Sequence, residues 1–379
     1  MVEKKLFSKG FRAQHLTIVL FYFCLLSGIL YFPDFIETIF HKKESKELFI
    51  SGFSDVITEE VFRLFEEETG IKVYPKYCDS DFEMLAQLSM GDESGYDLVS
   101  PSGYMAELMI KEDLLEAVDV SALENFNDID SFFLKNYTEG VPLKMVPISW
   151  SVHGLGFKKS FFDNRGIKQP KSLAYVLQPE KIFTARALQS RFKNYRVCIT
   201  DDSQELVCIS SIFLFGDVSN FSRARLQKIY NLLTRQRKWS LAYTTADVTY
   251  YLSHCAPVVL ALGAHVKNTL DENPLYDFTL TKEGSLLTVV NLCIPKKAKN
   301  RDSARKFIDF ILSPKIQAML FNQTGFCPTN VKGKKLMPLR YARHKAYSPD
   351  RKTMEKFYNI STLLSIKDSQ ELINSVKAS

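Results

Sequence analysis

The sequence predicts an α/β fold with a largely parallel sheet, and two observations lead to it. Short apolar runs typical of strands alternate three times with capped segments typical of helices between residues 47 and 111. The chain has 379 residues, which exceeds the size at which one hydrophobic core usually stops growing. With 46% hydrophobic residues it has enough apolar side chains for two cores, so we expect two compact units.

The first strand–helix unit begins with a strand at Leu48–Ile50. Thr58 is a suitable N-cap ahead of two glutamates, and Gly70 is a typical residue at a helix C-terminus. Apolar residues recur between them at helical spacing, which predicts a helix with one buried face.

Two more units follow directly. Ile71–Tyr74 predicts a strand, and Ser80 with Glu83 has the spacing of a capping box that opens a helix. Tyr96–Val99 predicts a third strand, which leads through Ser100–Gly103 into another helix. Such alternation indicates parallel strands joined by helices.

The rest of the chain repeats the pattern less regularly. Strands are predicted at Gly154–Phe157 and Arg196–Ile199, and Asp201–Asp202 opens a helix, so residues 150–262 are expected to form a second α/β lobe. The C-terminal part is expected to contain a strand at Ser285–Ile294, a helix capped near Asp302, a helix from Ser313–Pro314, and a basic, loop-like stretch from Lys334 to about Asp350.

The first 46 residues differ from the rest. Lys4, Lys5, Lys9 and Arg12 precede an apolar run over residues 16–32, which is typical of an export segment. A cleaved signal peptide and a retained membrane anchor both remain open, and a buried core helix is the alternative. Either export hypothesis predicts that the rest of the chain lies outside the cytoplasm.

Composition excludes several classes of protein. The charged fraction is 24% and the net charge +6, with both signs interspersed, so nucleic-acid binding is not expected. Seven cysteines include no C-x-x-C pair, so neither a zinc site nor another cofactor is predicted. Disulfides among the six cysteines beyond Cys24 and buried thiols both remain open.

Catalysis is not expected either. The sequence contains no G-x-S-x-G, H-E-x-x-H, P-loop or dinucleotide fingerprint. His153, His254 and His265 are interpreted as ordinary surface or core residues.

Six segments together resemble a known family. They are Leu48–Asp55, Phe65–Val73, Gly95–Ser102 with Tyr104, Ile199–Asp202 with Glu205, Ile294–Asn300 and Thr324–Phe326. In this order they resemble the spermidine/putrescine-binding family of bacterial extracellular solute-binding proteins. No single segment is specific, and their shared order carries the resemblance.

The resemblance implies a two-lobed periplasmic-binding-protein fold, type II-like, with the ligand between the lobes. It assigns residues 47–150 and 263–324 to one lobe and residues 151–262 and 325–379 to the other. It also implies a monomer that closes on a polyamine and delivers it to the permease subunits of an ABC transporter in the inner membrane.

A polyamine site needs carboxylates for the ammonium groups and aromatic faces for the chain. By resemblance, Phe53, Ser54 and Asp55 match ligand-contacting positions after the first strand, with Phe where the family usually has Trp. Ser102 and Tyr104 match a serine and a tyrosine after the third strand. The alternatives are that Phe53 is an ordinary loop aromatic, that Ser54 and Asp55 are polar residues at a helix start, and that Ser102 is only an N-cap.

An acidic pair and two aromatic residues complete the predicted site. Asp202 and Glu205 lie three residues apart, which places both carboxylates on one helix face and also fits a capping box. Trp150 either lines the cleft or packs at the hinge. Tyr243 either compensates for missing ring contacts or packs in the core.

Two stretches depart from the family pattern. Near Leu262 the family has a cleft tryptophan, and near Thr288 it has aromatic residues and an aspartate, whereas this chain has small, aliphatic or uncharged residues. The ligand therefore stays open between a polyamine and another small cation, amino-acid-like molecule or anion. An anchored interaction protein without a ligand is the remaining alternative.

Overall fold

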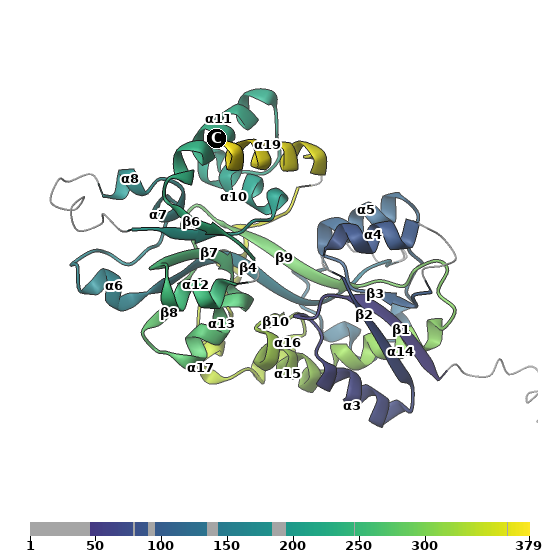
Figure 1. Cartoon of the computed structure of the whole chain (residues 1–379). Helices are drawn as coiled ribbons and strands as arrows, with labels where there is room; N and C mark the ends of the chain where they lie inside the picture. Colours follow the sequence, from purple (N-terminus) through teal and green to yellow (C-terminus); the bar gives the residue numbers. More distant parts are fainter. Residues whose placement is uncertain are drawn as a thin grey trace, which may run out of the picture. The chain divides into compact units, whose positions relative to one another are not determined.

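The computed structural model describes residues 46–78, 80–89, 95–134, 143–183, 195–245, 247–361 and 363–379. Three strand–helix units open this part of the chain (Figure 1). They comprise β1 (Glu47–Gly52), α3 (Glu59–Thr69), β2 (Lys72–Tyr77), α4 (Asp81–Ser89), β3 (Leu98–Val99) and α5 (Gly103–Lys111). The strands form a parallel sheet in the order β2-β1-β3, so the predicted alternation is confirmed.

Local signals set the ends of α3 as predicted. Thr58 is its N-cap residue, and Gly70 ends it in the left-handed conformation with φ of 69°. Val61, Phe62 and Phe65 are buried on one face, against the sheet and α14 (Arg301–Leu312). The Thr58 hydroxyl makes no capping bond and donates instead to Gln323 Oε1, 2.6 Å away.

The second sheet has eight strands and includes those of the second lobe together with the strands that connect the two lobes. Its main order is β11-β9-β4-β7-β5-β6, with β8 and β10 also paired to β4. Its strands are β4 (Val146–Lys158), β5 (Val197–Ile199), β6 (Ser240–Tyr243), β7 (Val258–Leu262), β8 (Tyr276–Thr279), β9 (Ser285–Leu292), β10 (Cys327–Pro328) and β11 (Phe357–Asn359).

Two long strands connect the two lobes. Residues 146–152 of β4 pair with β9, whereas residues 153–158 pair with β7 and β8. β9 also reaches the first lobe through a bridge from Val290 to Ser102, and Cys293, the residue after β9, forms a bridge to Val99. Figure 1 shows β4 and β9 running side by side between the lobes, which makes them the crossing strands of a two-lobed fold.

The lobes have separate hydrophobic cores. One core surrounds β1, α3 and α14, and another surrounds β5, α10 (Ser203–Phe215) and α11 (Arg223–Arg237). Two further clusters lie around Trp150 and Phe321 and around Met84 and Met105. The remaining helices are α6 (Lys159–Asp163), α7 (Ala174–Leu177), α8 (Pro179–Ile182), α12 (Val248–His254), α13 (Gly263–Glu272), α15 (Pro314–Thr324), α16 (Val331–Lys335), α17 (Leu339–Ala342), α18 (Arg351–Met354) and α19 (Ile366–Ala378), with 3-10 turns at Val120–Ala122 and Phe126–Asp128.

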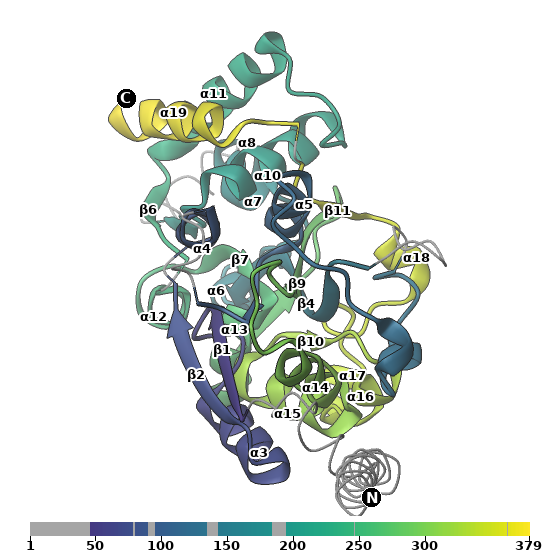
Figure 2. The same cartoon turned by 90° about the vertical axis from the view of Figure 1, so that its right-hand side faces the viewer.

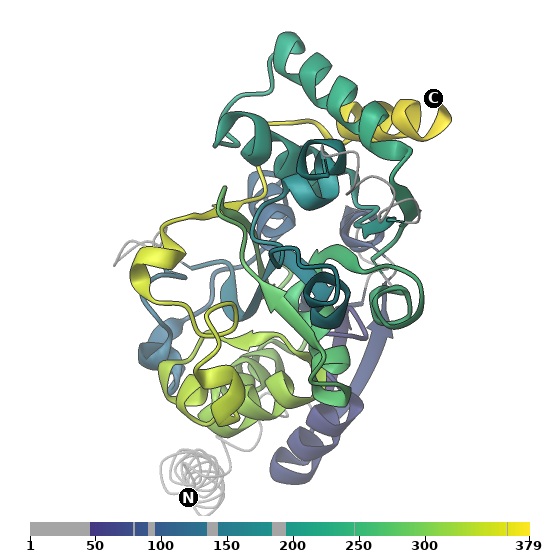
Figure 3. The ribbon, with the colours of Figure 1, turned by 90° about the vertical axis from the view of Figure 1, so that its left-hand side faces the viewer.

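The C-terminal region is more ordered than the sequence predicts. The stretch expected to be loop-like contains α17, and α19 packs on α10 and α11 at the outer end of the second lobe (Figures 2 and 3). A four-residue helix is too short to show periodicity, so its pattern cannot be read from the sequence.

The predicted lobe limits remain predictions, and two pairings bear on them. β8 was assigned to the first lobe, yet it pairs with the same half of β4 as β7. β10 was assigned to the second lobe, yet it pairs with the other half of β4.

The predicted export segment at residues 16–32 and Cys24 lie outside the described residues. Within residues 46–379, as far as they are described, no helix is both long and apolar enough to span a bilayer. Five of the cysteines in the described part of the chain carry free thiols. Four of them are buried, in agreement with the buried-thiol interpretation, and Cys255 is exposed. The five are Cys198, Cys208, Cys255, Cys293 and Cys327.

Candidate functional site

The candidate site lies where loops from both lobes meet. Two adjoining cavities, of about 220 and 340 Å³, share Asp202, Glu205, Leu262 and His265. Their lining residues follow the carboxyl ends of β1, β2, β3, β5 and β7, which is where open parallel sheets bind ligands. We call these two cavities together the acidic compartment, because five carboxylates line them. The five are Asp55, Asp81, Asp201, Asp202 and Glu205.

Asp202 is held at the N-terminus of α10. Its Oδ1 accepts the backbone N–H of Glu205 at 2.9 Å, so it is a genuine N-cap. Burial, and then the neighbouring Glu205 carboxylate, raise the pKa of Asp202 to about 7. An ionised Asp202 is therefore poorly compensated in the ligand-free protein.

Glu205 does not complete the capping box. Its Oε2 instead accepts the Thr200 hydroxyl at 2.8 Å and faces His153 Nε2 at 2.9 Å. Burial opposes ionisation of Glu205, but the His153 imidazole and the two hydrogen bonds outweigh it and hold the pKa of Glu205 below its ordinary value. Glu205 thus enters the compartment as a carboxylate with protein partners.

Asp81 is a third acidic group, contributed by the first lobe. It begins α4, and its carboxylate accepts both the backbone N–H and the hydroxyl of Ser102. Burial raises the pKa of Asp81 to about 6, although the bonds from Ser102 favour ionisation. The Ser102 hydroxyl therefore does not cap α5, which it precedes, but orients Asp81.

Tyr104 and two of the residues after β1 also line the acidic compartment. Burial, and then the nearby carboxylates, raise the pKa of the Tyr104 hydroxyl. Phe53 lines the cavity, and Asp55 lies 3.2 Å from His265 Nε2. Ser54 is exposed in the intervening turn and is not among the lining residues.

Two predicted ligand residues lie elsewhere. Trp150 is only 3% exposed, and its indole N–H donates to the Pro328 carbonyl at 3.0 Å, so of its two interpretations the structure favours hinge packing. The Tyr243 hydroxyl donates to Gln236 Oε1 at 3.3 Å, and Lys377 lies over its ring. Tyr243 is the last residue of β6, and Thr244, which follows it, lines the cavity. Because successive side chains of an extended strand point to opposite faces, the side chain of Tyr243 points away from the cavity.

Sequence reasoning missed Asp81, His153 and His265 as site residues. Asp81 looks like an ordinary acidic residue in the first turn of a helix, although its position after a predicted strand was an available signal. His153 lies inside a strand, and its neighbour Glu205 is 52 positions away in the chain. Only the packing of α10 on the crossing strands brings the two together.

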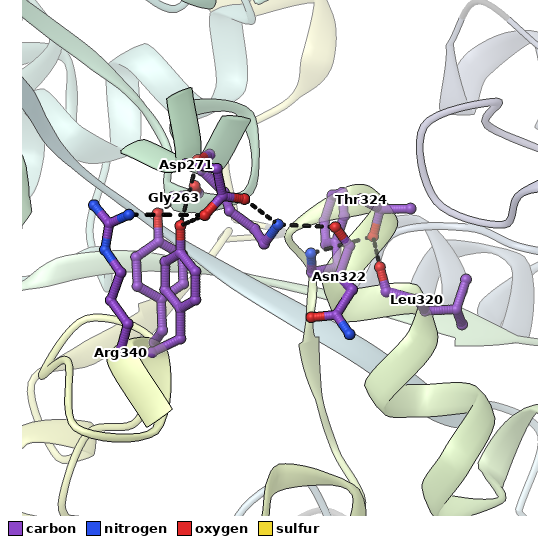
Figure 4. A network of polar contacts seen from close by, with 10 residues as sticks. Gly263, Asp271, Leu320, Asn322, Thr324 and Arg340 are labelled. Carbon is purple, nitrogen blue, oxygen red and sulfur yellow. Dashed lines mark hydrogen bonds and ion pairs between the residues drawn. The ribbon is translucent and has the colours of Figure 1, made fainter. Parts of the chain in front are cut away.

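A buried lysine fixes the helix that carries His265. Lys267 of α13 is 3% exposed, and its ammonium donates to Asp271 at 2.7 Å and to the Asn322 carbonyl at 2.8 Å. Figure 4 shows Asp271 and Asn322 on either side of this ammonium, with Arg340 beyond Asp271. The hydrogen bonds of Lys267 join α13 to α15. They therefore hold in place the first turn of α13, which carries His265 at the cavity.

The electrostatic character of the compartment follows from these residues. Among the described residues that line it, five are carboxylates, two are histidines, and none is lysine or arginine. Within the same described part of the chain, no cluster of His, Cys, Asp and Glu is arranged to hold a metal ion. The cavity therefore suits an organic cation, whose ammonium groups can pair with carboxylates.

The two lobes, the crossing strands and the interlobe site define the class of protein as a two-lobed solute-binding protein. A profile of the bacterial extracellular solute-binding protein family matches residues 60–334, which is more than half of the chain. The protein belongs to that family, and the resemblance seen in the sequence is confirmed.

Similar proteins agree with this assignment. The spermidine/putrescine-binding periplasmic protein of Salmonella typhimurium is 24% identical over 317 residues, covering 83% of this chain and 87% of that protein. A putrescine/cadaverine-binding protein of Pseudomonas aeruginosa is 25% identical over 290 residues, covering 74% and 78% of the two chains. The solved structure of a spermidine/putrescine ABC transporter substrate-binding protein from Streptococcus pneumoniae matches with a TM-score of 0.73 and 24% identity, covering 88% and 99% of the chains. That match confirms the predicted periplasmic-binding-protein fold.

Proposed function

We propose that this protein binds a polyamine of the spermidine or putrescine type in the acidic compartment and delivers it to an ABC-type permease. The observation that carries the proposal is the convergence of five carboxylates from both lobes on a cavity whose described lining contains no basic side chain other than histidine. Polyamine-binding relatives over most of the chain support the same ligand class.

Within this proposal the protein works by binding and has no catalytic step. An ammonium group would pair with Asp202 and Asp81, whose buried carboxylates accept hydrogen bonds from Glu205 and Ser102 but form no ion pair with lysine or arginine among the described residues. Tyr104 and Phe53 would contact the methylene chain. Closure of the lobes about β4 and β9 would then remove the ligand from water.

The proposal includes location and assembly. We propose that residues 1–46 direct export, that the body is a periplasmic monomer, and that residues 16–32 either are removed or tether it to the inner membrane. A protease-accessibility assay on spheroplasts, with an antibody against the C-terminus, tests export. Protection of the body from protease would contradict it.

An anion ligand is the weaker alternative, because anion sites use helix N-termini with arginine or lysine, and here the N-terminus of α10 carries Asp202. Isothermal titration of the full chain in mild detergent with putrescine, spermidine, spermine, amino acids and dicarboxylates separates the ligand classes. We expect heat only with the amines, and no heat with the Asp202→Asn, Glu205→Gln double variant.

The matched control is Asp217→Asn, which removes a carboxylate of the same lobe that pairs with Arg225 away from the cavity. It should bind like the unmodified protein. Amine binding that survives in the double variant, or binding of a dicarboxylate in place of amines, would contradict the proposed ligand. Absence of any ligand would favour an interaction protein built on this fold.

A further inference from the structure

A third cavity, of about 110 Å³, lies against the acidic compartment and differs from it in chemistry. Most of its lining is apolar and comes from both lobes and the crossing strands. We call it the apolar compartment. Its apolar side chains include Phe133, Leu134, Leu143, Met145, Leu287 and Val289.

The two compartments adjoin each other. Ser102, Tyr104, Thr288 and Ile360 line both the apolar cavity and the adjacent acidic one. A ligand held by Asp81 and Asp202 would reach the apolar compartment past Thr288, a residue that both cavities share.

Thr288 marks the junction with an unused hydrogen-bonding group. Its Oγ1 is buried and has no partner among the described residues. A buried hydroxyl normally has a partner, and a ligand that passes the junction would bring one.

The charges of the two compartments are unequal. Five carboxylates line the acidic compartment, whereas Glu107 is the single carboxylate among the described residues that line the apolar one. An ammonium group placed among leucine, methionine and phenylalanine side chains loses its hydration, whereas a hydrocarbon group gains by leaving water.

The volume limits what the apolar compartment can hold. A dry apolar cavity of about 150 Å³ takes a benzene ring. A cavity of about 110 Å³ accordingly fits a short alkyl chain rather than a large ring system.

We propose that the ligand is an amine with its positive charges at one end and an uncharged, apolar substituent at the other, the substituent being held in the apolar compartment. The inference rests on the proposed function and narrows it to N-alkylated or similarly substituted di- and polyamines. The shared chemistry is an ammonium head and a short hydrocarbon tail.

Two probes of nearly equal size test the proposal directly. N-butylputrescine has the chain length of spermidine, with a methyl group in place of one terminal ammonium. Titration calorimetry of the full chain in mild detergent should give an affinity for N-butylputrescine about tenfold or more above that for spermidine and for putrescine.

Two variants locate the effect. Val289→Phe fills the apolar compartment and should reduce the ratio of N-butylputrescine to putrescine affinity to near one, while putrescine binding reports that the variant is folded. Glu107→Gln should leave the affinity for N-butylputrescine within about twofold, because no ligand ammonium lies near Glu107 under this proposal.

The opposite outcomes are equally distinct. One such outcome is that spermidine binds more tightly than N-butylputrescine and that its affinity falls about tenfold or more in Glu107→Gln. This result would place an ammonium group in the apolar compartment. It would overturn the inference and leave the proposed function intact. Absence of binding by all three amines would overturn the proposed function together with the inference.

Discussion

Replacing Asp202 by asparagine should stabilise the ligand-free protein and weaken amine binding. Asparagine can still accept the Glu205 N–H, so the helix cap is kept while the charge is removed. The pKa of Asp202 is about 7, against an ordinary value of 3.8. That difference corresponds to roughly 4 kcal/mol of destabilisation once the group is ionised. Local relaxation and entry of water reduce this upper limit, so we expect a gain of about 1–3 kcal/mol at pH 8.

The sign of the pH dependence is fixed by the direction of the pKa change. Because folding raises the pKa of Asp202, the folded state binds the proton more tightly than the unfolded state does. The penalty is absent below about pH 3.8, grows as the pH rises, and is complete above about pH 7. The stability difference between Asp202→Asn and the unmodified protein should therefore be larger at pH 8 than at pH 5.

Urea unfolding followed by tryptophan fluorescence at pH 5 and pH 8 measures this difference. Asp217→Asn is the matched control, because Arg225 and the Ser219 bonds lower the pKa of Asp217 to about 2 and its replacement should give no gain at pH 8. In the same samples, calorimetry should show amine binding weakened by about 2–5 kcal/mol. An Asp202→Asn protein that is less stable at pH 8, or that binds amines normally, would refute the reasoning.

Three further predictions follow from the same contacts. Amine affinity should rise between about pH 5 and pH 8, because Asp81 and Asp202, with pKa values of about 6 and 7, must lose their protons to pair with ammonium groups; a flat titration profile would contradict this. His153→Gln keeps a donor to Glu205 but removes an ionisable group that lowers the pKa of both Glu205 and Asp202. Both pKa values should therefore rise and the acid loss of binding should begin at higher pH, as competition titrations at several pH values can show. Lys267→Met should lower the free energy of unfolding by about 1–3 kcal/mol, since it leaves the Asn322 carbonyl unpaired; an unchanged urea midpoint would show that the network contributes nothing.

Elements with local signals could be predicted from the sequence. Gly70 ends α3 in the left-handed conformation and Pro314 opens α15, because the freedom of glycine and the fixed φ of proline act at the residue itself. Thr58 also marks the start of α3, although its hydroxyl makes no capping bond. The extent of β4 was underestimated, because a strand buried over nearly its whole length shows no alternation of polar and apolar residues.

The site was only partly accessible to sequence reasoning. Asp202 and Glu205 stood out because they lie three residues apart at a predicted helix start and match an acidic pair of the family. The contact between His153 and Glu205 depends on tertiary packing and left no trace at either position. Trp150 was ambiguous for the same reason, since a tryptophan at a lobe crossing fits both a cleft wall and a core.

The continuity of β4 has a consequence for the length of the cargo. Pro147 borders the apolar compartment and His153 borders the acidic one, and both belong to one unbroken strand. At about 3.4 Å per residue, the backbone separates these two positions by at most about 20 Å, and the irregular pairing between Pro147 and Ser149 shortens this span. The spacing of the two compartments along this wall is therefore set by the backbone of one strand. Side-chain replacements can change which chemical group each end accepts, but resetting the span itself would require inserting or deleting residues in the strand.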